Sequence, residues 1–96
     1  RSIGTVLYIA PEQLLGSLNQ KSSTDVYSCG IVVFEMLTGK LPFLPGSIVE
    51  MWQLQSEGLK KLPSEIRPEL SPAIDNILLK ALAYEPEERF QDVLDF

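Results

Sequence analysis

The sequence has 96 residues, of which 45% are hydrophobic, and a chain of this size can form one modest core. Its net charge of −5 leaves no basic surface to bind nucleic acid or an anionic membrane. It has no histidine, which excludes most zinc sites and every histidine-based catalytic site, and no metal site is expected. The single cysteine, Cys29, cannot form an internal disulfide and is expected to be a small buried apolar residue. The longest apolar run, 31–34, is far shorter than the roughly 20 residues that span a bilayer, so a cytoplasmic segment without direct membrane contact is predicted.

The first half of the chain predicts two helices. A short helix is expected over residues 11–15, because Pro11 suits a first helical turn, and a polar loop follows it. The next helix, over residues 25–37, is apolar on nearly every side and must therefore be covered all round, and Gly39 can supply its left-handed C-terminal residue. The β-branched residues 31–33 would also suit a strand, but the length of the pattern and both end signals favour a helix.

The second half predicts three more helices. Ser47 and Glu50 have the spacing of a capping box for a helix that ends before Gly58. Its expected apolar face contains Ile48, Met51 and Trp52, with Leu54 as a further candidate. Residues 59–70 contain two prolines and are expected to be irregular. Ser71 and Pro72 then begin a helix with one buried stripe, formed by Ile74, Ile77, Leu78, Ala81 and Leu82. The "EPEER" segment ends this helix, "FQDVLDF" begins a last one, and the fold class is all-α.

Three motifs, in this order, resemble a protein kinase. They are "GTVLYIAPE" at residues 4–12, "DVYSCG" at residues 25–30, and "PEERF", which contains Arg89. Together with "EMLTGKLPF" between them, the resemblance covers nearly the whole chain and implies the second half of the large helical lobe, the C-lobe, with about five helices. Residues 1–96 would then be a partial kinase domain without the N-terminal lobe, the catalytic loop and the Asp-Phe-Gly segment. The stretches "PEQ" and "LKALAYEPEERFQDV" are most similar to bacterial serine/threonine kinases of the eukaryotic type.

The resemblance implies substrate-binding and phosphorylation sites near the start of the chain. Gly4 and Thr5 match the substrate-docking loop, in which the threonine hydroxyl bonds the catalytic aspartate and its neighbouring lysine and helps to hold the substrate alcohol in line. The Gly-Thr pair also favours a serine/threonine substrate over tyrosine. Tyr8 matches the ring that anchors this loop. Many kinases carry an activating phosphothreonine four positions before Thr5, but this chain has Arg1 there, which leaves the neighbouring Ser2 as a candidate phosphosite.

Three further residues are expected to support the active site. Glu12, in the motif that ends the activation segment, would form a buried ion pair with Arg89. Asp25 matches the carboxylate that accepts hydrogen bonds from the backbone of the catalytic loop. Each assignment has a simpler alternative: Thr5 as an ordinary loop hydroxyl, Asp25 as a helix N-cap, and Glu12 with Arg89 as unpaired surface charges. Tyr27 stands where many kinases have tryptophan.

The groups that perform kinase chemistry are missing from this sequence. It has no Gly-rich phosphate loop and no histidine for a His-Arg-Asp loop, and Asp95 with Phe96 follows Arg89, which is the wrong order for an Asp-Phe-Gly motif. The chain alone is therefore predicted to contain no catalytic residue and to bind neither the ATP nor the Mg²⁺ of the parent kinase. We expect a fragment of a serine/threonine kinase that acts on protein substrates. The alternative is a fragment of a pseudokinase, or a helical interaction module without catalysis, and the sequence carries no signal for an oligomeric state.

Overall fold

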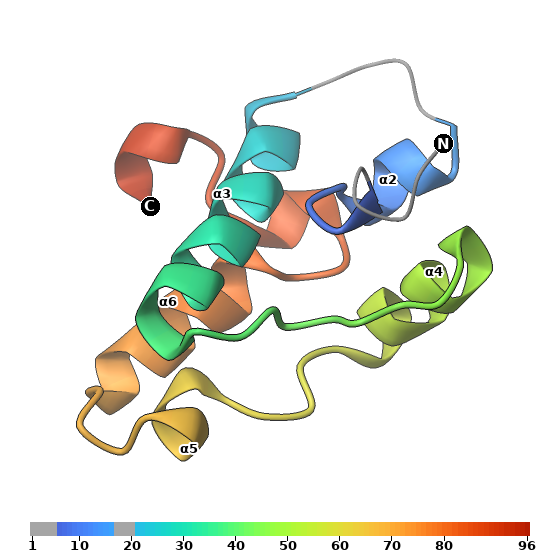
Figure 1. Cartoon of the computed structure of the whole chain (residues 1–96). Coiled ribbons are helices and arrows are strands. Elements are labelled where there is room, and N and C mark those ends of the chain that lie inside the picture. The colour runs from blue at the N-terminus through green and yellow to red at the C-terminus, as the bar shows by residue number, and fades with distance from the viewer. Residues whose placement is uncertain (1–5, 17–20) are drawn as a thin grey trace.

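The computed structural model describes residues 6–16 and 21–96, and these residues form helices and connecting loops without a strand (Figure 1). The α-helices are α2 (Pro11–Leu14), α3 (Ser22–Thr38), α4 (Ile48–Glu57), α5 (Pro63–Ile66) and α6 (Pro72–Ala81). Two short 3₁₀ helices follow, η1 (Pro86–Glu88) and η2 (Val93–Asp95). The predicted all-α class with about five helices is confirmed.

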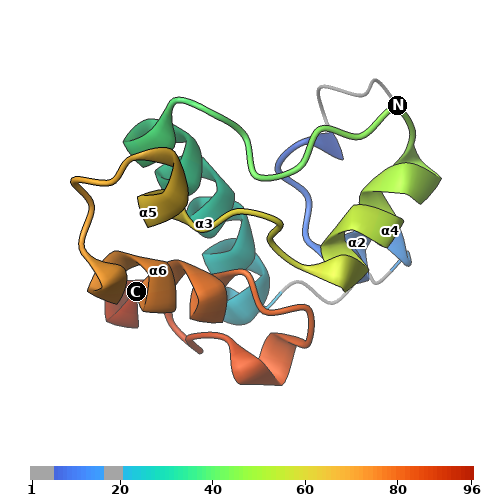
Figure 2. The same cartoon turned by 90° about the horizontal axis from the view of Figure 1, so that it is seen from below.

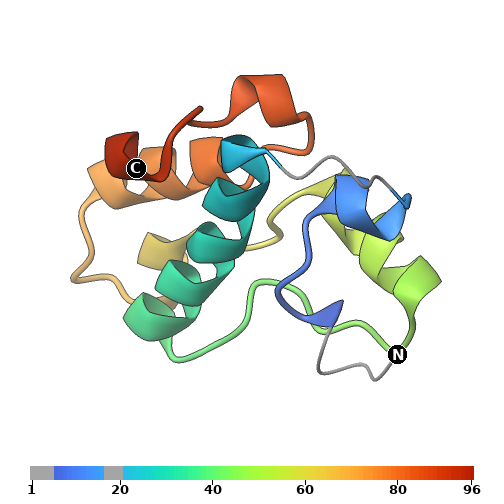
Figure 3. The ribbon, with the colours of Figure 1, turned by 90° about the horizontal axis from the view of Figure 1, so that it is seen from above.

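The long helix α3 organises one group of elements. In Figures 2 and 3, α5 and α6 lie with α3 on one side of the molecule, whereas α2 and α4 lie side by side on the other. Gly30 allows α3 and α6 to cross closely, because a Cβ atom at this position would lie only 3.0 Å from Leu82 Cδ2 and 3.2 Å from Ala81 Cβ. The predicted stripe of α6 is buried at Leu78, Ala81 and Leu82, but Ile77 is 41% exposed.

Helix α3 begins earlier than the sequence predicts. Its first residue is Ser22 and its N-cap is Lys21, so the expected start at residue 25 is wrong by three residues. The first turn is fixed by tertiary contacts, because Ser23 and Thr24 are buried and both take part in the polar cluster described below. The helix ends as expected at Gly39, which has a φ of +75°.

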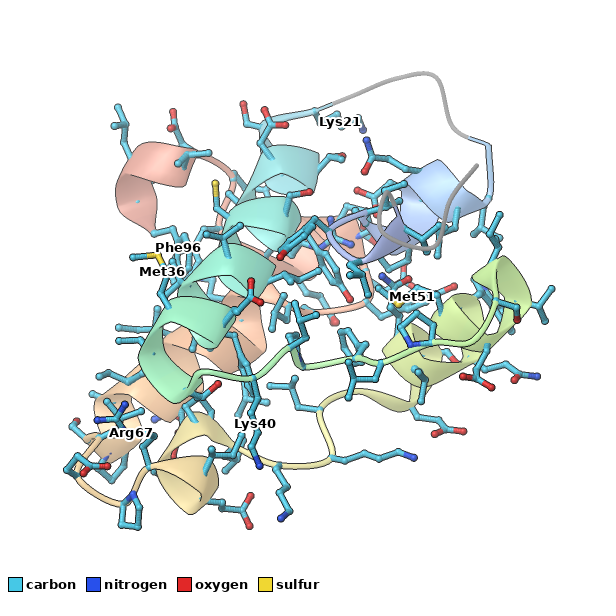
Figure 4. The ribbon with its side chains drawn as sticks, in the orientation of Figure 1. Lys21, Met36, Lys40, Met51, Arg67 and Phe96 are labelled. Atoms are coloured by element: carbon cyan, nitrogen blue, oxygen red, sulfur yellow. The ribbon has the colours of Figure 1, made fainter. Side chains whose placement is uncertain are left out.

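The predicted start of α4 is confirmed, but its predicted apolar face is partly wrong. The Ser47 hydroxyl accepts a hydrogen bond from the Glu50 N–H (3.1 Å), while the Glu50 carboxylate accepts one from Gly46. Met51 is fully buried and points from α4 into the interior (Figure 4), whereas Ile48 and Trp52 are 44% and 38% exposed. The buried face instead includes Gln55, because this side of α4 packs against the segment that precedes α2.

Two other regions differ from the expectation. Residues 59–70 were expected to be irregular, but they contain α5, whose first turn is held by the buried Asp75 carboxylate through hydrogen bonds from Ser64 N–H and Oγ. The final segment forms only the 3₁₀ turn η2, in which the Asp92 carboxylate accepts a hydrogen bond from the Leu94 N–H. In both regions a carboxylate satisfies backbone groups that a short helix leaves unpaired.

Part of α3 is uncovered, contrary to the expectation for a helix that is apolar all round. Val32 and Met36 are 43% and 75% exposed, and Cys29 is only half-buried rather than buried. Met36 projects from α3 on the side where Phe96 lies (Figure 4). An apolar groove of about 280 Å³ also opens between α3 and α6. Its lining residues are Val33, Leu37, Ile74, Ile77, Leu78 and Phe96. Among the described residues, no helix has the length and hydropathy needed to cross a bilayer.

The uncovered face of α3 predicts self-association of the isolated 96-residue chain. Exposed apolar surface of this kind favours association, so we expect a sedimentation coefficient that rises with protein concentration and binding of an apolar fluorescent dye. A Met36→Ser variant should weaken both, because Met36 is 75% exposed and contributes little to the core. A wild-type chain that stays monomeric and binds no dye would refute this prediction.

Candidate functional site

The predicted ion pair between Glu12 and Arg89 joins the two ends of the chain. The guanidinium Nη1 and Nη2 atoms donate to the two carboxylate oxygens of Glu12 at 2.8 and 2.9 Å. The Arg89 side chain is 0% exposed and that of Glu12 is 19% exposed. The pair is therefore bidentate and buried on its arginine side, which excludes the alternative of two unpaired surface charges.

Arg89 makes further contacts that use its whole guanidinium group. Nε donates to the Ala83 carbonyl (2.7 Å), Nη1 also donates to the Ser23 carbonyl (3.1 Å), and Nη2 also donates to the Tyr84 carbonyl (2.9 Å). The guanidinium carbon lies 4.6 Å from the centre of the Tyr27 ring. With Glu12, these contacts give a partner to every N–H that an arginine side chain can donate, so a fully buried charge is compensated.

The environment of Glu12 favours its ionised form. Burial alone would raise the pKa of this carboxyl, but hydrogen bonds from Arg89 and from the Thr24 hydroxyl (2.7 Å) outweigh burial, and the pKa is lowered from its ordinary value of 4.5. Glu12 also lies in the first turn of α2, where the helix dipole stabilises a negative charge. At neutral pH the pair is a true ion pair.

Tyr27 lies beneath this cluster, at the position where the kinase resemblance has tryptophan. Its side chain is fully buried, and burial raises the pKa of its phenol well above the usual value. The hydroxyl has no hydrogen-bond partner among the described residues, so the ring acts mainly as an apolar and cation–π support for Arg89. The aromatic replacement therefore keeps the guanidinium stacked.

Residues 8–10, which follow the predicted docking loop, are held by side chains from three helices. Ser28 of α3 donates to the Tyr8 carbonyl, and Gln55 of α4 donates to the Ile9 carbonyl, each at 2.7 Å. Gln13 of α2 accepts a hydrogen bond from the Ala10 N–H at 3.0 Å. Three consecutive residues are thus fixed from three directions, and we call residues 8–10 the clamped segment.

The Tyr8 side chain adds a fourth attachment to this segment. Its hydroxyl donates to the Glu35 carboxylate of α3 at 2.7 Å, and this hydrogen bond, together with partial desolvation and the nearby negative charge, raises the pKa of the phenol. At neutral pH Tyr8 therefore remains the donor. Its contact with α3 is compatible with the anchoring function that the resemblance implies.

The remaining sequence-predicted site residues are Ser2, Gly4, Thr5 and Asp25. Ser2, Gly4 and Thr5 lie outside the described residues. Asp25 is exposed in the first turn of α3 and is the fourth helical residue, so the hypothesis that it is the N-cap is wrong. Its function toward a catalytic loop stays a prediction.

Sequence reasoning missed four polar side chains of the site, namely Gln13, Thr24, Ser28 and Gln55. A signal was present for two of them: Ser28 interrupts the apolar sequence of α3, and Gln55 follows the buried Met51 by one helical turn. A polar residue on a buried helical face requires a hydrogen-bond partner. The spacing of residues in the sequence, however, does not show which group that hydrogen-bond partner is.

Chemically, this arrangement can position a chain segment, and nothing in it resembles a metal centre. Among residues 6–16 and 21–96, no three histidine, cysteine, aspartate or glutamate side chains are grouped so that they could hold a metal ion. The charged groups of the cluster, Arg89 and Glu12, bind each other and neighbouring polar groups of the chain. What the contacts show is that side chains of three helices hold residues 8–10 in place.

Comparison with known proteins identifies relatives along almost the full chain. Residues 1–93 match the family model described as "Protein kinase domain". The chain is 41% identical over 97 residues to serine/threonine-protein kinase PrkC of Bacillus subtilis, which covers 97% of the chain and 14% of PrkC. It is 42% identical over 90 residues to serine/threonine-protein kinase PknB of Mycobacterium tuberculosis, which covers 93% of the chain and 14% of PknB. It is 35% identical over 96 residues to serine/threonine-protein kinase Pkn1 of Myxococcus xanthus, which covers 98% of the chain and 13% of Pkn1. The chain thus spans only 13 to 14% of the length of these three relatives.

Removal of either partner of the ion pair should strongly destabilise the complete domain. Glu12→Ala leaves a buried guanidinium without its counter-charge, and Arg89→Ala removes every hydrogen bond described for that side chain, so we expect each to cost about 3 to 5 kcal/mol of unfolding free energy. The double variant should lose much less unfolding free energy than the two single variants lose in sum. Urea unfolding of the wild type, both single variants and the double variant measures this. Arg89→Lys should recover only part of the loss, because lysine cannot form the bidentate contact. Small and additive losses would contradict the importance of the pair.

The lowered pKa of Glu12 predicts a loss of stability in acid. Because the folded-state pKa is below 4.5, the contribution of ionised Glu12 is fully present above that pH and is lost as the pH falls through the folded value. In urea unfolding from about pH 7 to about pH 3, the wild-type domain should therefore lose more stability than a Glu12→Gln variant. Glu69 also has a lowered pKa, but it is present in both proteins and cancels. Equal pH dependence in the two proteins would argue against this contribution.

Proposed function

Because the chain belongs to the protein kinase domain family, we propose that its parent protein is a serine/threonine kinase, which transfers the γ-phosphoryl group of ATP to hydroxyl groups of protein substrates. The similarity to bacterial serine/threonine kinases, predicted from the sequence motifs, is confirmed by the bacterial relatives. Within the parent protein, the function proposed for this part is substrate docking and support of the active site.

The clamped segment is the single observation that best supports the docking function. Residues 8–10 begin three positions after Thr5, and side chains of α2, α3 and α4 hold them in place. A loop attached to such a fixed segment loses less conformational entropy when it binds a peptide, so the substrate hydroxyl can be held in line at a lower cost. The Glu12–Arg89 pair fixes α2, which carries one of the three attachments.

The residues of this chain do not fit ATP with Mg²⁺. The described part of the chain offers no grouping of metal-binding side chains, and the sequence has no Gly-rich loop to surround phosphates. We therefore infer that ATP and Mg²⁺ are bound by other parts of a complete kinase domain. What this chain's own residues contribute is the position of the protein substrate.

Partners and location are proposed on the same basis. The partner is a protein with a serine or threonine hydroxyl, and the acidic net charge of −5 disfavours nucleic acid. A cytoplasmic location without direct membrane contact of this segment remains a prediction. If a purified domain that contains this segment transfers no phosphate from ATP to a serine- or threonine-containing protein, the alternative of a pseudokinase or helical interaction module is favoured.

Thr5 provides the test of substrate docking in an active parent domain. Thr5→Ala removes one hydroxyl from the positioning network, so we expect a lower kcat with an unchanged melting temperature, measured by steady-state phosphorylation of a peptide. Thr5→Ser keeps the hydroxyl and should be milder. The isolated 96 residues serve as the negative control and should show no calorimetric ATP binding. An unchanged kcat/KM for Thr5→Ala would refute the docking function.

A further inference from the structure

Gln55 is a buried polar residue with a long-range hydrogen bond. Its side chain is 2% exposed and lies on the face of α4 that also carries the fully buried Met51. Its Nε2 atom donates to the carbonyl of Ile9, 46 residues earlier in the chain, at 2.7 Å. An amide at such a position is costly to bury, and this hydrogen bond offsets part of that cost. Gln55 is thus the polar link between α4 and the clamped segment.

The Gln55 side chain also lies close to Tyr27. Its Oε1 atom is buried without a hydrogen-bond partner among the described residues, and so is the hydroxyl of Tyr27. The Gln55 side chain is near enough to the Tyr27 hydroxyl to affect the pKa of that phenol. Tyr27 in turn supports the Arg89 guanidinium. Gln55 therefore lies between the buried cluster and the backbone of Ile9.

The other two side chains that hold the backbone of the clamped segment cannot replace Gln55. Ser28 holds the carbonyl of Tyr8 and Gln13 holds the N–H of Ala10, so each acts on a different peptide group. The Ile9 N–H is already used in a turn, in which it donates to the Val6 carbonyl at 3.2 Å. Without Gln55, the Ile9 carbonyl would lose the side-chain hydrogen bond described for it, and the turn 6–9 could move.

We propose that Gln55 is a positioning residue for substrate docking, because its hydrogen bond to the Ile9 carbonyl fixes the turn that connects the docking loop to α2. This inference rests on the proposed function of Gly4 and Thr5. It assigns to α4 a specific effect on substrate affinity. A turn that is fixed before the substrate arrives does not have to be ordered when the substrate binds. Loss of the Gln55 hydrogen bond should therefore weaken the binding of the substrate and of the transition state by the same factor.

The kinetic test uses the complete kinase domain with a serine- or threonine-containing peptide. Gln55→Met has a similar shape but cannot donate to the Ile9 carbonyl, so we expect the KM for the peptide to rise about 3- to 10-fold, the range set by the loss of one hydrogen bond. The kcat and the KM for ATP should stay within about twofold. Gln53→Met, an exposed glutamine on the same helix, is the matched control and should change none of these values. An unchanged peptide KM in Gln55→Met would overturn the proposal, even if its melting temperature falls.

A second readout separates this inference from the proposed function. Hydrogen exchange of the amides of Ile9 and Ala10 should be about 10-fold faster in Gln55→Met, while that of Leu82 in the α6 cap should be unchanged. If the wild-type domain has no kinase activity, the proposed function fails, and the substrate-docking part of this proposal fails with it. Faster exchange would then still support positioning by Gln55, and equal exchange would overturn it. Gln55→Asn, which is one methylene shorter, serves as the second variant if Gln55→Met does not fold.

Discussion

The structure depends on one buried guanidinium group. Arg89 is fully enclosed and binds the Glu12 carboxylate together with the carbonyls of Ser23, Ala83 and Tyr84. These partners belong to α2, to the first turn of α3 and to the segment that follows α6. Because a buried charge without its hydrogen bonds is very unfavourable, each of these segments has little freedom to move relative to the others. The ring of Tyr27 completes the enclosure from the side of α3.

The position of residues 8–10 follows from this anchor. Glu12 fixes α2, and the next residue, Gln13, holds the N–H of Ala10. Helix α3, fixed through its first turn, supplies Ser28 for the carbonyl of Tyr8. The proposed docking function therefore uses ordinary hydrogen bonds, two of which come from helices that Arg89 links to each other. In the proposed function these contacts perform no chemistry and act only by holding residues 8–10 in place.

Two buried charged groups of this chain have their hydrogen-bond partners, whereas part of its apolar surface is exposed. The guanidinium of Arg89 and the carboxylate of Asp75 are paired, whereas Val32 and Met36 of α3 are exposed beside an apolar groove. A hydrogen bond needs only a few correctly placed atoms, and neighbouring residues of the same chain supply these atoms to Arg89 and Asp75. Covering an apolar helix requires whole packed elements, and the described residues provide them on only part of α3.

The sequence alone determined where α2, α4 and α6 begin and where α3 and α4 end, because capping residues, prolines and apolar spacing act within about one helical turn. It also predicted the Glu12–Arg89 pair, although through the resemblance of ordered motifs rather than through local physics. Only the tertiary structure decided the early start of α3, the helix α5, the exposure of Trp52 and the hydrogen bond of Gln55. These features depend on contacts between groups that are distant in the chain, such as Gln55 and the Ile9 carbonyl, and local periodicity carries no information about such partners.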